Sequence, residues 1–112
     1  MEPKLKLWVE KDGAIVLSGY RVQLLEHIAD SGSLAEAARR MGLSYRRAWG
    51  KIKEIETNLG VPLVESEVGG AGGGGTHLTP VGERIVDLYQ QFETSVQADV
   101  RSLFVELFSE EV

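Results

Sequence analysis

The chain of 112 residues has no cysteine, which excludes disulfide scaffolds, thiolate zinc sites and thiol catalysis. Its only histidines, His27 and His77, are too few for a multi-histidine metal site. No apolar run exceeds a few residues, so the sequence predicts no membrane span. The N-terminus has charges without an apolar stretch behind them, which argues against a signal peptide and favours a cytoplasmic location. We expect one domain over residues 1–112, with no metal, no cofactor and no catalytic residues.

The segment from Arg39 to Lys53 lacks acidic residues altogether. It holds six of the 12 Lys and Arg residues, and all 17 Asp and Glu residues lie elsewhere. The segment therefore carries +6 in a chain whose net charge is −5, which leaves −11 for the remainder. A solvated surface helix usually mixes both signs, so this segregation indicates an anionic partner.

Turn residues and hydrophobic periods divide the chain into elements. Alternating apolar residues on both sides of Asp12-Gly13 predict a β-hairpin over 4–18. Period-3.6 patterns predict three helices over 19–59, of which 33–59 would be a helix-turn-helix. Ser33 and Glu36 have the spacing of a capping box at the start of the second helix, and Gly42 fits its end.

The third helix has an apolar arc and a basic one. At 100° per residue, the apolar arc comprises Tyr45, Ala48, Ile52, Ile55 and Leu59. Arg46, Gly50 and Lys53 lie opposite, flanked by Arg47 and Lys51, as a helix in a DNA major groove requires. Trp49 lies at the border, where packing at the rim is favoured over contact with a base or sugar.

Glycine is rare inside helices, yet Gly50 lies in the middle of this one and costs about 1 kcal/mol relative to alanine. A small residue on the exposed arc would allow close approach to a phosphate chain, and a neutral accident is equally compatible.

Downstream, two short strands around the tract Gly69–Gly75 predict a wing over 61–79. The glycines match a dinucleotide fingerprint weakly, because no helix begins at the tract.

The last predicted helix, 80–108, begins with Thr79 as cap and Pro80 at its first position. An apolar stripe runs along its length and is too long for a small domain to cover. We therefore expect a second copy to cover it. The expected dimer interface consists of Ile85, Leu88, Phe92, Val96, Val100, Leu103 and Leu107.

Two stretches carry a family resemblance. Ser31-Gly32-Ser33-Leu34-Ala35-Glu36-Ala37-Ala38 and Gly42-Leu43-Ser44-Tyr45-Arg46-Arg47-Ala48-Trp49 resemble the N-terminal DNA-binding domain of ModE-type molybdate-responsive regulators. The helix-turn-helix is also similar to that of LysR-type regulators. The resemblance covers about residues 19–92 and implies a dimeric winged helix regulator of transcription, with a possible link to molybdenum metabolism. In full-length relatives a separate C-terminal module binds molybdate, and 112 residues are too few to include it.

Together these patterns predict an α+β, mostly α, winged helix-turn-helix protein that binds double-stranded DNA as a homodimer and is not an enzyme. Its effector, if any, is unknown. Two rival functions stay open, a dimeric protein-interaction module and an oxyanion or nucleotide binder that uses the glycine tract. The predicted DNA-binding residues are Arg39, Arg40, Ser44, Tyr45, Arg46, Arg47, Trp49, Gly50, Lys51, Lys53, Gly73, Gly74, Thr76 and His77.

Overall fold

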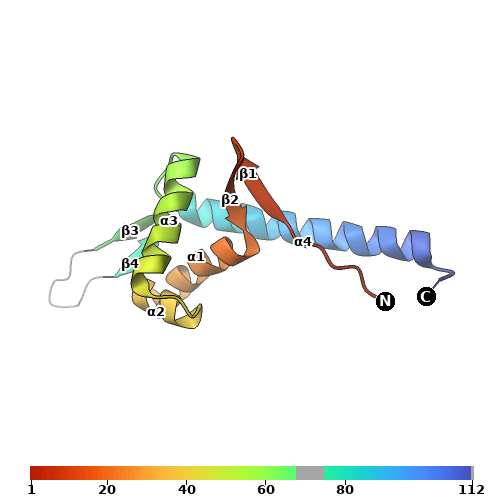
Figure 1. The fold of residues 1–112 in the computed structure, drawn as a ribbon, viewed down its shortest axis with the longest axis horizontal. Coiled ribbons are helices and arrows are strands. Elements are labelled where there is room, and N and C mark those ends of the chain that lie inside the picture. The colour runs from red at the N-terminus through yellow and green to blue at the C-terminus, as the bar shows by residue number, and fades with distance from the viewer. Residues whose placement is uncertain (68–74, 112) are drawn as a thin grey trace.

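Four helices and two small antiparallel sheets make up the fold, in the order β1–β2–α1–α2–α3–β3–β4–α4. The computed structural model describes residues 1–67 and 75–111. Figure 1 shows a head formed by the first seven elements, from which α4 projects as a long arm. The expected winged helix-turn-helix architecture is confirmed.

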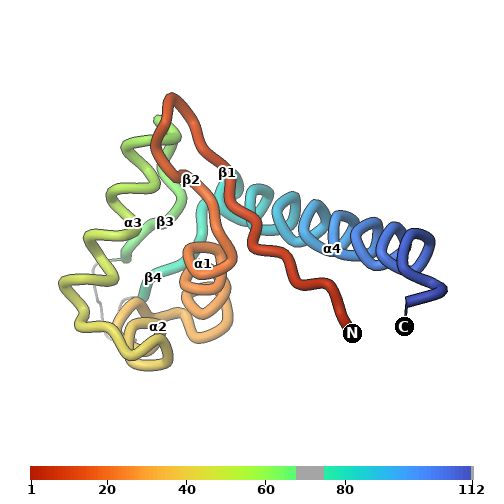
Figure 2. Tube along the Cα trace, turned by 45° about the vertical axis from the view of Figure 1, so that its right-hand side comes forward, coloured from red at the N-terminus to blue at the C-terminus, as the bar shows by residue number. Residues whose placement is uncertain are grey.

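The N-terminal hairpin pairs β1 (Trp8–Lys11) with β2 (Ala14–Ser18). Asp12 and Gly13 both have positive φ, as a two-residue type I′ turn requires. The prediction that the hairpin begins at residue 4 is wrong. Trp8 pairs with Ser18, the last residue before a helix, so residues 4–7 have no strand to pair with. They run beside α4 instead, where the Tyr89 hydroxyl donates to the Leu7 carbonyl oxygen at 3.0 Å (Figure 2).

The three helices of the head are α1 (Gly19–Ser31), α2 (Leu34–Arg40) and α3 (Tyr45–Leu59). Each begins after a serine whose hydroxyl accepts from the backbone N–H three residues later. The expected capping box at α2 is half right. The Ser33 hydroxyl accepts from the Glu36 N–H at 3.1 Å, but the Ser33 N–H donates to the Ser31 hydroxyl. The Glu36 carboxylate turns to arginines, because they offer a charged partner.

One apolar core lies where the three helices, the wing strands and the start of α4 meet. Apolar side chains from all of these elements form this core. Helix α3 packs against the head through its apolar arc, and its basic arc stays outside the core. The fully buried large residues of the head are Val16, Val22, Leu24, Leu25, Ile28, Ile52, Ile55 and Leu63.

The wing consists of β3 (Val64–Ser66) and β4 (Thr76–Leu78), which lead directly into α4 (Pro80–Phe108). The Thr79 hydroxyl caps α4 by accepting from the Gly82 N–H at 2.9 Å, and it donates to the Pro62 carbonyl oxygen at 2.9 Å. Gly82 lies so close to the Leu63 backbone that an added Cβ would overlap the Leu63 carbonyl oxygen. This contact sets the position at which α4 leaves the head.

Helix α4 has 29 residues and a length of about 43 Å. Only its first turns pack on the head, through Gly82, Val86 and Tyr89. Along the expected stripe, Leu88, Phe92, Leu103 and Leu107 are between 49% and 67% exposed, whereas Ile85, Val96 and Val100 are partly covered. None of the helices in the described part of the chain combines the length and the apolar character needed to cross a membrane.

Candidate nucleic-acid interface

Arg46 and Arg47 project from the first turns of α3, which lies across the head next to the wing (Figure 1). The Ser44 hydroxyl caps the helix by accepting from the Arg47 N–H at 3.1 Å. Both arginine side chains are exposed, and neither takes part in an ion pair among residues 1–67 and 75–111. They are therefore two charges that the head itself does not neutralise.

Tyr45 does not belong to the buried arc of α3, contrary to the sequence-based prediction. Its side chain is 57% exposed and lines a shallow depression together with Ser33 and Gly75. The first turn of α3 extends past the core, so the arc that buries Ala48 and Ile52 faces open space at Tyr45. The phenol is thereby placed on the same surface as the two arginines.

Trp49 and Lys53 lie one turn apart on α3 and contact each other. The indole is half-buried against the core, and the Lys53 ammonium lies 4.3 Å from the centroid of its ring. The same ammonium is 3.1 Å from Oε1 of Glu56. Two attractive contacts hold the Lys53 side chain in one orientation, which lowers the entropy that a ligand would have to remove.

Glu56 is a residue that the sequence-based contact set does not contain. Its Oε2 accepts from the backbone N–H groups of Leu63 at 2.7 Å and Val64 at 3.2 Å. Burial raises the pKa of this carboxyl, but the hydrogen bonds from Leu63, Lys53 and Val64 outweigh burial and lower it. Glu56 therefore joins the start of the wing to the basic arc of α3. The only signal of this role in the sequence is the position of Glu56 at the edge of the apolar arc of α3.

The remaining residues of α3 differ in their surroundings. Lys51 is half-buried, with its ammonium 5.3 Å from the centroid of the Tyr20 ring at the start of α1. Gly50 is exposed, and a Cβ added there would meet nothing within 4 Å. The fold therefore does not require glycine at this position, whereas Lys51 is oriented by a neighbouring helix.

Arg39 and Arg40 lie on α2 and are already paired. Glu36 binds both of them, with Arg39 as close as 2.6 Å, and Asp30 binds Arg40 at 2.7 Å. The hydrogen bond from Arg39, followed by that from Arg40, lowers the pKa of Glu36 to about 2. The segment from Arg39 to Lys53 contains no acidic residue in the sequence, but the fold brings two carboxylates to its arginines. Glu36 reaches them through helical spacing, and Asp30 reaches Arg40 from the neighbouring α1.

The wing residues that were expected at the interface lie on different faces of the wing. Thr76 is buried, and its hydroxyl lies 3.4 Å from that of Ser66. His77 is exposed opposite Glu65 in the ladder, with Nε2 at 3.2 Å from the Glu65 carboxylate. Gly73 and Gly74 lie outside the described residues. Alternation along β4 places Thr76 and His77 on opposite faces, so of these two side chains only the imidazole is exposed to solvent.

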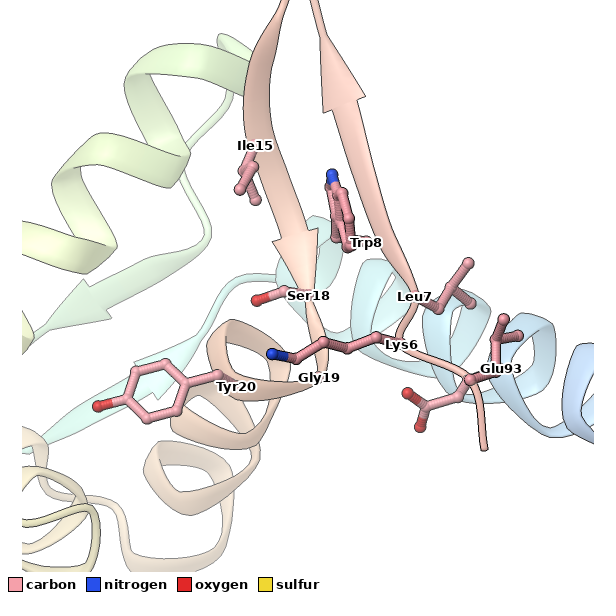
Figure 3. A pocket seen from close by; sticks show the side chains of 9 residues that line it. Lys6, Leu7, Trp8, Ile15, Ser18, Gly19, Tyr20 and Glu93 are labelled. Carbon is pink, nitrogen blue, oxygen red and sulfur yellow. The ribbon is translucent and has the colours of Figure 1, made fainter. Parts of the chain in front are cut away.

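Figure 3 shows a cleft between the hairpin and the start of α1. Trp8 and Ile15 of the hairpin and Tyr20 of α1 form its apolar walls, with Lys6 and Glu93 at its rim.

Within residues 1–67 and 75–111, no three His, Asp or Glu side chains come together in a way that would hold a metal ion. The exposed basic groups of α3 are the surface feature best suited to a charged ligand.

Comparison with known proteins agrees with this geometry. The family model for bacterial regulatory helix-turn-helix proteins of the lysR family matches residues 20–83. The transcriptional regulator ModE of Yersinia pestis is 36% identical over 97 residues, which cover 87% of this chain and 37% of that protein. The molybdenum-pterin-binding protein MopB of Rhodobacter capsulatus is 40% identical over 88 residues, covering 79% of this chain and 32% of that protein.

Solved structures agree on the fold. The DNA-binding domain of CbnR, in a crystal structure with DNA, superposes with a TM-score of 0.61 at 23% identity. That match covers 80% of this chain and 99% of the CbnR domain. The chain spans about a third of the length of the curated relatives ModE and MopB.

Proposed function

This chain belongs to the lysR family of bacterial regulatory helix-turn-helix proteins, and we propose that it binds double-stranded DNA sequence-specifically as a homodimer and thereby regulates transcription. The observation that carries the proposal is the pair of exposed, unneutralised arginines on α3, the second helix of the family's helix-turn-helix. In such motifs the second helix enters the major groove and its N-terminal residues contact base edges.

The geometry favours different tasks for the basic side chains. Arg46 lies on the outward arc of α3 and would pair with guanine O6 and N7, the commonest specific contact of arginine. Arg47 and Lys51 lie on the flank of the helix and would hold phosphates. Arg39 and Arg40 would reach phosphates only by giving up Glu36 and Asp30, so we propose a smaller part for them.

The homodimer would form through α4. Its exposed apolar stripe is longer than the head can cover, and a monomer would present it to water. A two-fold dimer would place two recognition helices about one DNA turn apart, about 34–36 Å or a multiple, and its site would have inverted symmetry.

The relatives also suggest a biological context. Names among them refer to molybdenum transport and to a molybdenum-pterin. We propose that the genes controlled by this chain belong to molybdenum metabolism. Comparison of transcripts with and without the gene, in medium with and without molybdate, tests this, and unchanged transcripts of molybdenum-related genes would contradict it.

The proposal is tested by selecting duplexes from a random pool and measuring affinity against salt concentration. On α3, Arg46, Arg47 and Lys51 lie outside the ion pairs of the described residues. The two that we place on phosphates, Arg47 and Lys51, would let a dimer neutralise about 4 phosphates, so log K should fall with log salt with a slope of about −4. Arg101→Ala removes the same charge from α4 and is the matched control, expected to leave the slope unchanged. A slope near zero, or no binding at low salt, would favour the rival protein-interaction function instead.

A further inference from the structure

The cleft between the hairpin and the start of α1 has no part in the proposed function (Figure 3). Of the residues that line it, only Tyr20 lies inside the family's matched segment, and none is among the predicted DNA-binding residues or the expected dimer interface. Its volume of about 470 Å³ lies within the range of about 300–1,000 Å³ that is typical of small-molecule sites. The cleft is therefore a candidate site for a small ligand.

Two aromatic side chains form walls of the cleft, and a polar contact holds each of them in place. The Trp8 indole N–H donates to the Glu10 carboxylate at 2.8 Å, and the Lys51 ammonium lies 5.3 Å from the centroid of the Tyr20 ring. Trp8 is 48% exposed and Tyr20 is 43% exposed, so the head leaves much of their aromatic surface open. Walls that are oriented before a ligand arrives lose little entropy when it binds, and such rings pack favourably against another aromatic ring.

Two groups of opposite charge line the same cleft without neutralising each other. Figure 3 shows the Lys6 side chain pointing towards Tyr20, and Glu93 reaching from α4 towards the start of α1. The Glu93 carboxylate lies close to the α1 backbone, because a Cβ added at Gly19 would be 3.6 Å from its Oε2. In the part of the chain that the structure describes, neither Lys6 nor Glu93 takes part in an ion pair. A ligand with one group of each sign would pair with both of them.

We propose that the cleft binds a small aromatic molecule that carries both a carboxylate and an ammonium group, which is the chemistry of an aromatic amino acid. The ring of the ligand packs against Trp8 and Tyr20, with Ile15 beside it. Its carboxylate pairs with the Lys6 ammonium, and its ammonium group pairs with the Glu93 carboxylate. The inference goes beyond the proposed function, because it requires neither DNA nor a second copy of the chain.

Simpler ligands complement the cleft less well. An aromatic acid without an ammonium group would bring its carboxylate into a cleft that already holds Glu93 and would leave that residue unpaired. An aromatic amine without a carboxylate would add a second cation beside Lys6. An aliphatic amino acid would pair both charges but would forgo the contact between rings. A ligand with a ring and both charges is therefore the one that matches all the groups of the cleft.

Titration of the full chain with L-phenylalanine and with L-tryptophan, followed by NMR, tests the proposal. The chain has two tryptophans, so an isotope-labelled sample gives one indole N–H signal for each. The Trp8 signal should shift as either amino acid is added, whereas Trp49 does not line the cleft and its signal serves as the internal control. Phenethylamine lacks the carboxylate of phenylalanine, hydrocinnamate lacks its ammonium group, and L-leucine lacks its ring. Each should bind at least about tenfold more weakly than L-phenylalanine.

Substitutions test the two charges separately. Lys6→Gln should weaken the binding of L-phenylalanine about tenfold without weakening that of phenethylamine, which has no carboxylate to pair. Glu93→Gln should weaken the binding of L-phenylalanine about tenfold without weakening that of hydrocinnamate, which has no ammonium group. Lys4→Gln is the matched control, because Lys4 is a lysine of the same segment that lies outside the cleft and pairs with Glu2 at 3.0 Å. It should leave the affinity unchanged.

Each contrary outcome overturns a stated part of the proposal. No shift of the Trp8 signal with either amino acid at about 10 mM, which would fill a site with a Kd of about 1 mM, would refute the site itself. Equal affinity for L-leucine would refute the aromatic ligand, and equal affinity for phenethylamine or hydrocinnamate would refute the paired charges. A Trp8 signal that shifts with protein concentration alone would show that a second copy of the chain occupies the cleft, which would also overturn the proposal.

Discussion

Removing the Glu56 side chain should loosen the wing from α3 and destabilise the protein. The carboxylate is only 11% exposed and accepts from two backbone N–H groups, those of Leu63 and Val64. Each N–H that loses its acceptor and stays out of water costs about 1–3 kcal/mol. Because the Val64 bond is long, at 3.2 Å, and water can enter beside Lys53, we expect Glu56→Ala to lower the free energy of unfolding by about 2–4 kcal/mol.

The pH dependence separates the charge from the packing. Glu56 has its pKa lowered in the folded state, so its stabilising effect is complete above the ordinary glutamate pKa of about 4.3. It is lost as the pH falls through the lower folded value. Glu56→Gln keeps one acceptor without the charge, and its deficit relative to wild type should shrink as the pH falls below about 4.

Urea unfolding followed by circular dichroism, at one protein concentration, measures these differences. Glu54→Ala is the matched control, because Glu54 is on the same helix and is 57% exposed in a surface pair with Arg21. Such pairs contribute about 0.2–1 kcal/mol. A Glu56→Ala deficit no larger than that of Glu54→Ala would refute the role of Glu56 in joining the wing to α3.

Two further predictions concern the fold. Gly82→Ala should lower the free energy of unfolding by about 1–3 kcal/mol in urea unfolding, because its Cβ would overlap the Leu63 backbone, and an unchanged value would show that the start of α4 can shift at no cost. Ser33→Ala should lower the free energy of unfolding by about 1 kcal/mol, because α2 loses its cap. Ser102→Ala on the exposed face of α4 is the control, and equal effects of the two substitutions would contradict the capping role.

The fold could be predicted well because its signals are local. Each helix of the head follows a serine that caps it, and the periodic apolar residues Ala48, Ile52 and Ile55 are buried as the arc predicted. The Asp12-Gly13 turn and the Thr79-Pro80 helix start were equally readable. Such features depend on residues within one turn of one another, and packing then reinforces them.

What the sequence could not predict depends on residues far apart along the chain. Asp30 of α1 reaches Arg40, and Glu56 reaches the backbone of Leu63, through packing that no local pattern encodes. The exposed position of Tyr45 follows from where the core ends, not from the helical period. The late start of β1 at Trp8 has the same origin, since a strand cannot pair where its partner has become a helix.

The most direct test of the account measures how Arg46→Ala and Arg47→Ala bind the selected duplex and each of its single-base variants. Arg46→Ala should cost about 1–3 kcal/mol on the best site and relax the preference at one base pair. Arg47→Ala should weaken binding to all duplexes alike and make the salt slope less steep by about two, because the dimer loses one phosphate contact in each protomer. If the two variants exchange these effects, the recognition helix is rotated relative to our proposal. If neither variant changes binding, α3 does not read the DNA and the central claim is wrong.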